Sequence, residues 1–163
     1  MRKLLPAGVA VAIVAGCGPL IRPVGTMETA RDTRILSGAE IDSQTLAIIG
    51  RACRDCHSLN TVLPFYGHFA PFSWLIARDV QQARLHMNLS QWQEYSAADR
   101  ARLLSEIGGA VRKRQMPVQR YLLLHREARL SDQEREKVYQ WTRAERSRLR
   151  SQQTQSELDS SSP

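Results

Sequence analysis

The sequence feature that most constrains the fold is the motif Cys53-Arg54-Asp55-Cys56-His57. Two cysteines separated by two residues, with a histidine directly after them, have the spacing of c-type haem attachment. The two thiols can add to the two vinyl groups of one porphyrin, and the adjacent imidazole then reaches the iron from one face. The motif therefore predicts one covalent haem c, bound through Cys53 and Cys56, with His57 as the proximal iron ligand.

Two other kinds of Cys-x-x-Cys site fit the sequence less well. A structural zinc site needs two further Cys or His ligands at close spacing, and no second pair is present. A redox-active dithiol is typical of an α/β fold, whereas this chain shows no strand pattern. The remaining cysteine, Cys17, lies far upstream in an apolar segment, so nothing indicates a disulfide scaffold.

The N-terminus is predicted to direct the chain to a membrane. Arg2 and Lys3 precede residues 4–21, which carry no charge, and we interpret 1–21 as a signal or membrane anchor. Within it, Val14-Ala15-Gly16-Cys17 resembles a bacterial lipobox, which makes Cys17 a candidate for lipidation. An uncleaved helix is the alternative, because residues 4–21 would extend roughly 27 Å at ~1.5 Å per residue. A secreted soluble form is the third reading. All three predict a domain on the periplasmic side of a bacterial membrane.

The rest of the chain predicts an all-α fold. Pro23, Gly25 and Gly38 suggest a tether over 22–39, and the haem-binding domain is expected over 40–146. The Ser/Gln-rich segment 147–163 is expected to be a disordered polar tail. The architecture should be a small helical bundle around one haem, similar in style to small cytochromes c.

Apolar periodicity and capping signals divide this domain into helices. One helix is expected over 41–52, a second from Pro71 to about His86, and a third from Ser96 until Met116-Pro117. A final helix is expected to begin at Ser131. Residues 58–72 and 88–95 should be irregular connections. For the second helix we expect these buried side chains: Trp74, Leu75, Ile76, Val80 and Ala83.

The second axial ligand of the iron has two candidates. Met116 precedes a proline and lies before the final helix, which is where small single-haem cytochromes place a methionine ligand. His125 is the alternative ligand, and it could instead hydrogen-bond a haem propionate or the backbone. The weaker candidates are His68, His86, Met87 and Met27.

Several blocks that follow the motif resemble the bacterial haem-binding domain family, whose members are single-haem proteins with a membrane-targeted N-terminus. The resemblance covers residues 40–143 and implies haem binding, but little about a reaction or partner. Leu63, Phe65, Leu89 and the pair Arg78-Asp79 depart from the family's usual pattern. The blocks are Ser58-Leu59-Asn60-Thr61, Pro64-Phe65-Tyr66, residues 70–75, residues 87–92, and Met116-Pro117 with Tyr121, His125, Ala128, Leu130, Ser131 and Trp141.

The formal charge of +7 restricts the partners only weakly. The arginines of segment 100–150 alternate with Asp and Glu, which favours a solvated helical surface. We expect no nucleic-acid partner. A basic face could instead steer an acidic redox protein.

Three functions are compatible with these features. The favoured one is single-electron transfer, which needs only a six-coordinate haem, and the protein would then not be an enzyme. The second is a peroxide-active or gas-sensing haem protein with an open iron position. The third is a non-redox haem module of a membrane complex.

Overall fold

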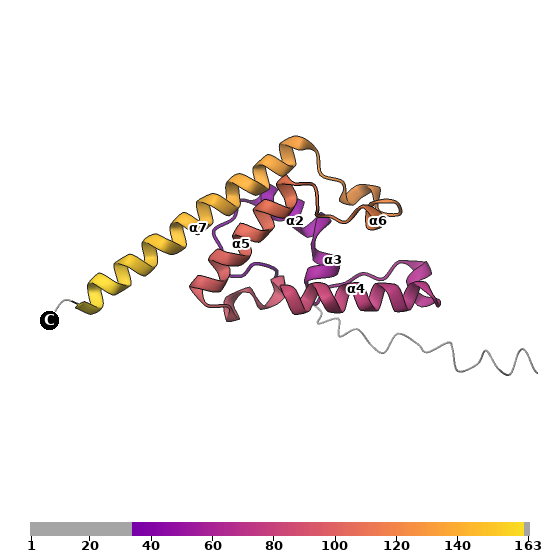
Figure 1. Cartoon of the computed structure of the whole chain (residues 1–163), viewed down its shortest axis with the longest axis horizontal. Coiled ribbons are helices and arrows are strands. Elements are labelled where there is room, and N and C mark those ends of the chain that lie inside the picture. The colour runs from indigo at the N-terminus through magenta and orange to yellow at the C-terminus, as the bar shows by residue number, and fades with distance from the viewer. Residues whose placement is uncertain (1–33, 162–163) are drawn as a thin grey trace, which may run out of the picture.

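The computed structural model describes residues 34–161, and the regular secondary structure of this part is entirely helical, without a strand. The prediction of an all-α fold is therefore confirmed. The described elements, shown in Figure 1, are α2 (Ser43–Ala52), α3 (Arg54–His57), η2 (Phe65–His68), α4 (Phe72–His86), η3 (Leu89–Glu94), α5 (Ala97–Arg112), α6 (Gln119–Leu122), η4 (Arg126–Ala128) and α7 (Asp132–Ser161).

Helices α5 and α7 form the framework of the domain, lying side by side, with α2 also packed on α7 (Figure 1). Their apolar faces meet in one core that extends to η3 and to the segment before α2. The indole nitrogen of Trp141 donates a hydrogen bond to the carbonyl of Glu40 at 2.8 Å, which ties α7 to the chain just before α2. The core contains Leu36, Ile48, Ile49, Leu89, Trp92, Leu103, Leu104, Val111, Val138, Trp141 and Leu149.

Side-chain caps start the helices where the sequence predicts. The Ser96 hydroxyl accepts a hydrogen bond from the Asp99 amide at 3.0 Å. Ser131 and Glu134 cap each other reciprocally, with amide-to-side-chain distances of 2.8 and 3.1 Å. Each cap satisfies an amide that would otherwise lack a partner in the first helical turn.

The third predicted helix ends earlier than expected. Helix α5 stops at Arg112, because Arg114 adopts a left-handed backbone with φ of 58° and reverses the chain. The amides of Gln115 and Met116 then donate to the carbonyl of Ala110. Met116 consequently lies on a loop rather than at the end of a helix.

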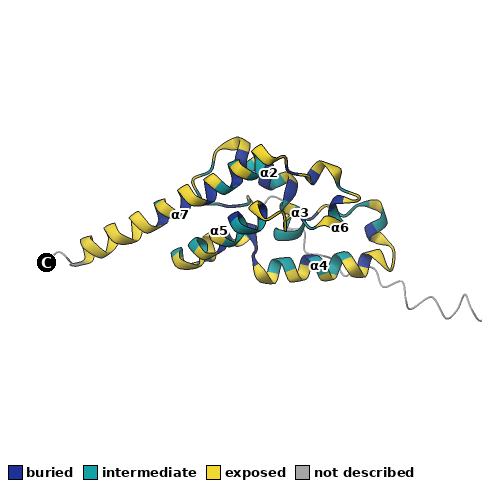
Figure 2. Ribbon diagram, turned by 45° about the horizontal axis from the view of Figure 1, so that its top comes forward, coloured by how far each residue is buried: buried dark blue, intermediate teal, exposed yellow. Residues whose placement is uncertain are grey.

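The prediction of a disordered tail over 147–163 was wrong for its described part. Helix α7 continues to Ser161, Leu149 is buried in the core, and Arg148 pairs with the buried Glu145 at 2.5 Å. Residues 151–161 contain no Gly or Pro to break the helix, so it continues although residues 151–160 are exposed (Figure 2).

The predicted tether over 22–39 also needs correction at its end. Residues 34–39 belong to the domain, since Leu36 is buried and its amide donates to the carbonyl of Leu89 at 2.9 Å. Residues 1–33, with the predicted signal and Cys17, lie outside the described residues. Among the described helices, none has the length and apolar character needed to span a bilayer.

Helix α4 buries less of its surface than expected. Val80 is buried, but Trp74 and Leu75 are 47% and 55% exposed. The reason is that α4 packs mainly on α3 and η2, which cover only one side of it.

Two neighbouring glycines of α5 provide a matched test of this packing. A Cβ at Gly108 would lie 2.5 Å from the Thr142 hydroxyl oxygen of α7, whereas a Cβ at Gly109 would meet nothing within 4 Å. We expect Gly108→Ala to destabilise the fold by about 1–3 kcal/mol through overpacking, measured by denaturant unfolding. Gly109→Ala should instead stabilise it by about 0.5–1 kcal/mol, since alanine favours a helix. Equal effects of the two changes would contradict the close α5–α7 contact.

Candidate functional site

The cysteine motif forms a helical turn of its own. Helix α2 is interrupted at Cys53, and α3 then winds from Arg54 to His57, with the His57 amide donating to the Cys53 carbonyl at 3.0 Å. Residues three and four apart share one face of a helix. Cys53, Cys56 and His57 therefore face the same side, although they are nearly consecutive in sequence.

A cavity of about 420 Å³ lies against this face. Its size is within the usual range of ligand pockets, and its wall is mostly apolar. Both thiols and His57 line it, and so does Met116 from the loop after α5. The other lining residues include Ala52, Val62, Leu63, Pro64, Tyr66, Ile76, Val80, Ala83, Met87, Leu103, Ile107, Ala110, Val111, Pro117, Val118, Tyr121 and His125.

The imidazole of His57 is oriented by a backbone carbonyl. Its Nδ1 lies 3.2 Å from the carbonyl oxygen of Met87. A carbonyl only accepts hydrogen bonds, so Nδ1 carries the proton and Nε2 has the free lone pair. Burial lowers the pKa of His57, which favours the neutral imidazole that metals bind. This arrangement, with a hydrogen bond behind the ligating ring, is typical of a metal-binding histidine.

The two thiols are held in their neutral form. Burial raises the pKa of Cys53 to about 12, with a further contribution from the neighbouring Cys56. Burial likewise raises the pKa of Cys56 to about 11. An apolar wall that disfavours the thiolate suits the uncharged thioether sulfur that haem attachment would produce.

The candidates for the second axial ligand differ in their existing partners. Met116 lines the cavity and is 38% exposed. His125 also lines the cavity, but its Nε2 lies 2.7 Å from the Tyr66 hydroxyl and its Nδ1 lies 2.9 Å from a Glu127 carboxylate oxygen. Iron ligation by His125 would therefore require one of these hydrogen bonds to break, whereas Met116 has no such bond to give up.

The four weaker candidates for the second iron ligand differ in their position relative to the cavity. His86 and Met87 line the cavity, with His86 Nε2 lying 2.9 Å from a Glu106 oxygen, whereas His68 is exposed and does not line it. Met27 lies outside the described residues.

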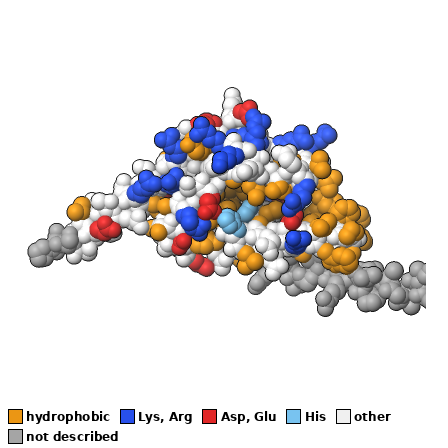
Figure 3. Space-filling model, viewed as in Figure 1, with side chains coloured by type: hydrophobic (Ala, Val, Ile, Leu, Met, Phe, Trp, Pro, Cys, Tyr) orange, Lys and Arg blue, Asp and Glu red, His pale blue; other side chains and the backbone are white. Residues whose placement is uncertain are grey.

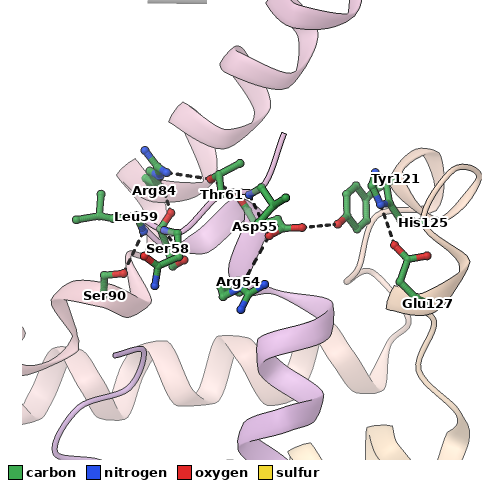
Figure 4. A network of polar contacts seen from close by, with 12 residues as sticks. Arg54, Asp55, Ser58, Leu59, Thr61, Arg84, Ser90, Tyr121, His125 and Glu127 are labelled. Carbon is green, nitrogen blue, oxygen red and sulfur yellow. Dashed lines mark hydrogen bonds and ion pairs between the residues drawn. The ribbon is translucent and has the colours of Figure 1, made fainter. Parts of the chain in front are cut away.

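A polar network connects the motif to the loop that carries His125 (Figure 4). Tyr121 stacks on His125 with ring centroids 4.1 Å apart, and its hydroxyl donates to Asp55 at 3.3 Å. Burial raises the pKa of Tyr121 above its usual range, so the hydroxyl keeps its proton. Asp55, the residue between the two cysteines that directly precedes Cys56, thus links the attachment turn to the opposite wall of the cavity.

Arg84 holds the segment that follows the motif. Its Nε donates to the Ser58 carbonyl at 2.8 Å, and another guanidinium nitrogen donates to the Thr61 hydroxyl at 2.9 Å. The Thr61 hydroxyl in turn donates to the Asp55 carbonyl at 2.6 Å, as Figure 4 shows. The role of Arg84 leaves no signal in the sequence, because its partners lie 23 and 26 residues earlier in the chain and no local pattern connects them.

The residues present fit a c-type haem. Two thiols and a correctly protonated imidazole face one apolar cavity, and Met116 lines the same cavity as a candidate for the second ligand. Within residues 34–161, no three His, Cys, Asp or Glu side chains converge as a site for a bare metal ion.

We expect Arg84→Ala to lower the free energy of unfolding by about 1–3 kcal/mol, because it leaves the buried Ser58 carbonyl and Thr61 hydroxyl without their donor. The measurement is denaturant unfolding of the haem-loaded protein. Arg102→Ala is the control, since Arg102 forms only exposed ion pairs on α5, and we expect no measurable change. An equally small effect at Arg84 would show that this residue does not hold the segment.

Comparison with known proteins agrees with the geometry. No curated protein and no solved structure shows a significant match to the chain. The family model of the haem-binding domain matches residues 18–144, which is most of the sequence. The chain belongs to the haem-binding domain family.

Proposed function

We propose that this domain attaches one haem c covalently and transfers single electrons on the periplasmic side of a bacterial membrane. The observation that carries the proposal is the common face of α3: Cys53, Cys56 and His57 line one cavity, and Met116 lines it too. Haem binding follows from the family, and the covalent bond, the axial pair and electron transfer are the proposal's own steps.

The proposed attachment is an addition reaction without net oxidation or reduction. Each thiol adds across one vinyl C=C bond, so that the sulfur bonds to one carbon and the hydrogen ends on the other. The neutral thiols of Cys53 and Cys56 supply both atoms. His57 would hold the iron through Nε2, and the Met87 carbonyl, 3.2 Å from Nδ1, would keep the ring from turning.

A methionine in the second axial position favours electron transfer over catalysis. A thioether ligand raises the reduction potential and leaves no open position for peroxide or a gas. The bound haem would supply a single electron by alternating between ferric and ferrous iron. The surrounding helices would exclude water from its faces, so we propose a carrier rather than an enzyme.

One observation supports a second candidate function. The chain from Glu127 through His125 to Tyr66 forms an acid–base relay at the cavity wall. If Met116 did not bind the iron, His125 and Tyr66, which line the same cavity, could serve as the acid–base groups that peroxide-active haem proteins require. The coordination state of the iron separates the two functions.

The location and partner are proposed from the sequence. Residues 1–21 carry the features of an export signal or anchor, with Cys17 as the candidate lipidation site. Haem attachment of this kind takes place outside the cytoplasm, which agrees with such a signal. An acidic redox protein would complement the net charge of +7.

The covalent bond is tested by intact mass. Protein purified from a host that exports and matures c-type cytochromes should gain the mass of one haem and keep it after denaturation. The Cys53→Ser, Cys56→Ser double variant should lose covalent haem, because neither thioether can form. Cys17→Ser is the matched control and should keep the haem. Haem that dissociates from the denatured native sequence would refute covalent attachment.

The axial ligand is tested by absorption and redox titration. Ferric protein should be low-spin and show the weak long-wavelength charge-transfer band of methionine–iron ligation. Met116→Ala should abolish this band and lower the potential by on the order of 0.1 V or more. His125→Ala should retain the band. A band that survives in the Met116 variant, or a high-spin protein that binds carbon monoxide readily, would instead support the second function.

A further inference from the structure

An exposed apolar surface lies beside the cavity but is not part of it. Seven large apolar side chains are between 47% and 81% exposed, and none of them lines the cavity, so a haem there would not cover them. We call them the apolar face. They are Phe65, Phe69, Phe72, Trp74, Leu75, Leu123 and Leu124.

The apolar face is assembled from two segments. Phe65 packs edge-to-face on Phe69 with ring centroids 5.2 Å apart, around η2 and the start of α4. Tyr66 contacts Phe72 at 5.8 Å, and its hydroxyl bonds His125, which brings the 123–125 loop to the same end of the molecule. Figure 3 shows hydrophobic side chains gathered at this end, beyond the N-terminal part of α4.

The charges of these two segments have one sign. The chain contains 16 acidic residues, yet segments 57–78 and 115–126 contain no Asp or Glu. They carry three arginines: Arg78, Arg120 and Arg126. The acids nearest in sequence form ion pairs within the domain: Asp79 pairs with Arg120 at 3.0 Å, which also neutralises one of these arginines, and Glu127 pairs with His125 at 2.9 Å. Aromatic and leucine side chains on segments that also carry Arg78 and Arg126 complement an anionic lipid surface.

The N-terminal segment brings such a surface within reach. Residues 4–21 are uncharged and predicted to enter or be anchored to a membrane, and residues 22–33 separate them from the described domain. Fully extended, residues 22–33 reach at most roughly 43 Å, and residues 18–33, the tether of a chain lipidated at Cys17, reach at most roughly 58 Å. Such an anchor would keep the domain near the bilayer, and a second contact through a face of the domain would fix its orientation.

We propose that the apolar face lies on the anionic bilayer surface, with its Phe and Trp rings in the interfacial region and with Arg78 and Arg126, from the same two segments, at lipid phosphates. This inference depends on the membrane attachment in the proposed function, but not on covalent haem attachment or electron transfer. Because Tyr66 and Val62 line the cavity next to this face, the contact would turn that side of the haem pocket towards the membrane.

Site-specific photocrosslinking tests the contact in the full-length, haem-loaded protein. Benzoylphenylalanine is placed at position 65 or 75, and the protein is bound to vesicles of phosphatidylcholine and phosphatidylglycerol. The control position is Leu85, which is 75% exposed near the other end of α4 and outside the apolar face. We expect lipid adducts at positions 65 and 75 to exceed those at 85 at least about fivefold.

The remaining outcomes overturn the proposal. They are equal lipid yields at 65 and 85, adducts at 65 to a second copy or to a co-purifying protein instead of lipid, or a chain that does not stay with the vesicles. Haem absorbance and mass are recorded on the same samples. Lipid adducts without covalent haem would therefore refute the proposed attachment and leave this contact standing.

Tryptophan fluorescence gives a second measurement without a new side chain. Trp74 belongs to the apolar face, whereas Trp92 and Trp141 are 0% and 7% exposed. Adding the vesicles should shift the emission of the native protein to shorter wavelength, and Trp74→Phe should remove that shift. A shift that persists in this variant would overturn the assignment.

Discussion

The site depends on one constraint: two thiols and an imidazole must face the same side of a single helical turn. Helix α2 ends before Cys53 and α3 begins at Arg54. This break meets the constraint, because positions 53, 56 and 57 then share one helical face. Everything around α3 serves to hold this turn against the cavity. Helix α5, which packs on α7, contributes one part of the cavity wall, and α4 contributes another.

The contacts around the turn come from distant parts of the chain. The Met87 carbonyl sets the tautomer of His57 from the end of α4, and Arg84 holds the segment after the motif from the same helix. Tyr121 reaches Asp55 from the far wall. These groups do not touch Nε2 of His57 or the two sulfur atoms, but they determine how the candidate haem-binding atoms face the cavity. A haem-attachment motif in an unsupported loop would lack that orientation.

The two sides of the described domain have different chemistry. Helices α5 and α7 bury their apolar faces against each other and present mixed charges outside, as soluble helices do. The apolar face, at the other end of the domain, exposes aromatic and leucine side chains instead. It lies on η2, the start of α4 and the 123–125 loop, and segments 57–78 and 115–126, which contain these elements, also carry arginines. Exposed apolar surfaces of this kind mark sites of contact with another molecule or a membrane. The asymmetry places the haem cavity between a stable helical framework and a face suited to association.

The sequence by itself determined the helical class and the starts of the main helices, and it predicted the attachment residues, because capping, periodicity and motif spacing act within a few residues. The predictions from the sequence were wrong where burial depends on contacts between residues far apart in the chain. Trp74 and Leu75 fit a buried pattern, yet no element covers them, and Leu36 is buried through a partner more than fifty residues away. The engagement of both nitrogens of His125, which distinguishes it from Met116, likewise depends on Tyr66, from another part of the chain. Only the tertiary structure brings such side chains together, since contacts between residues far apart in sequence leave no local pattern.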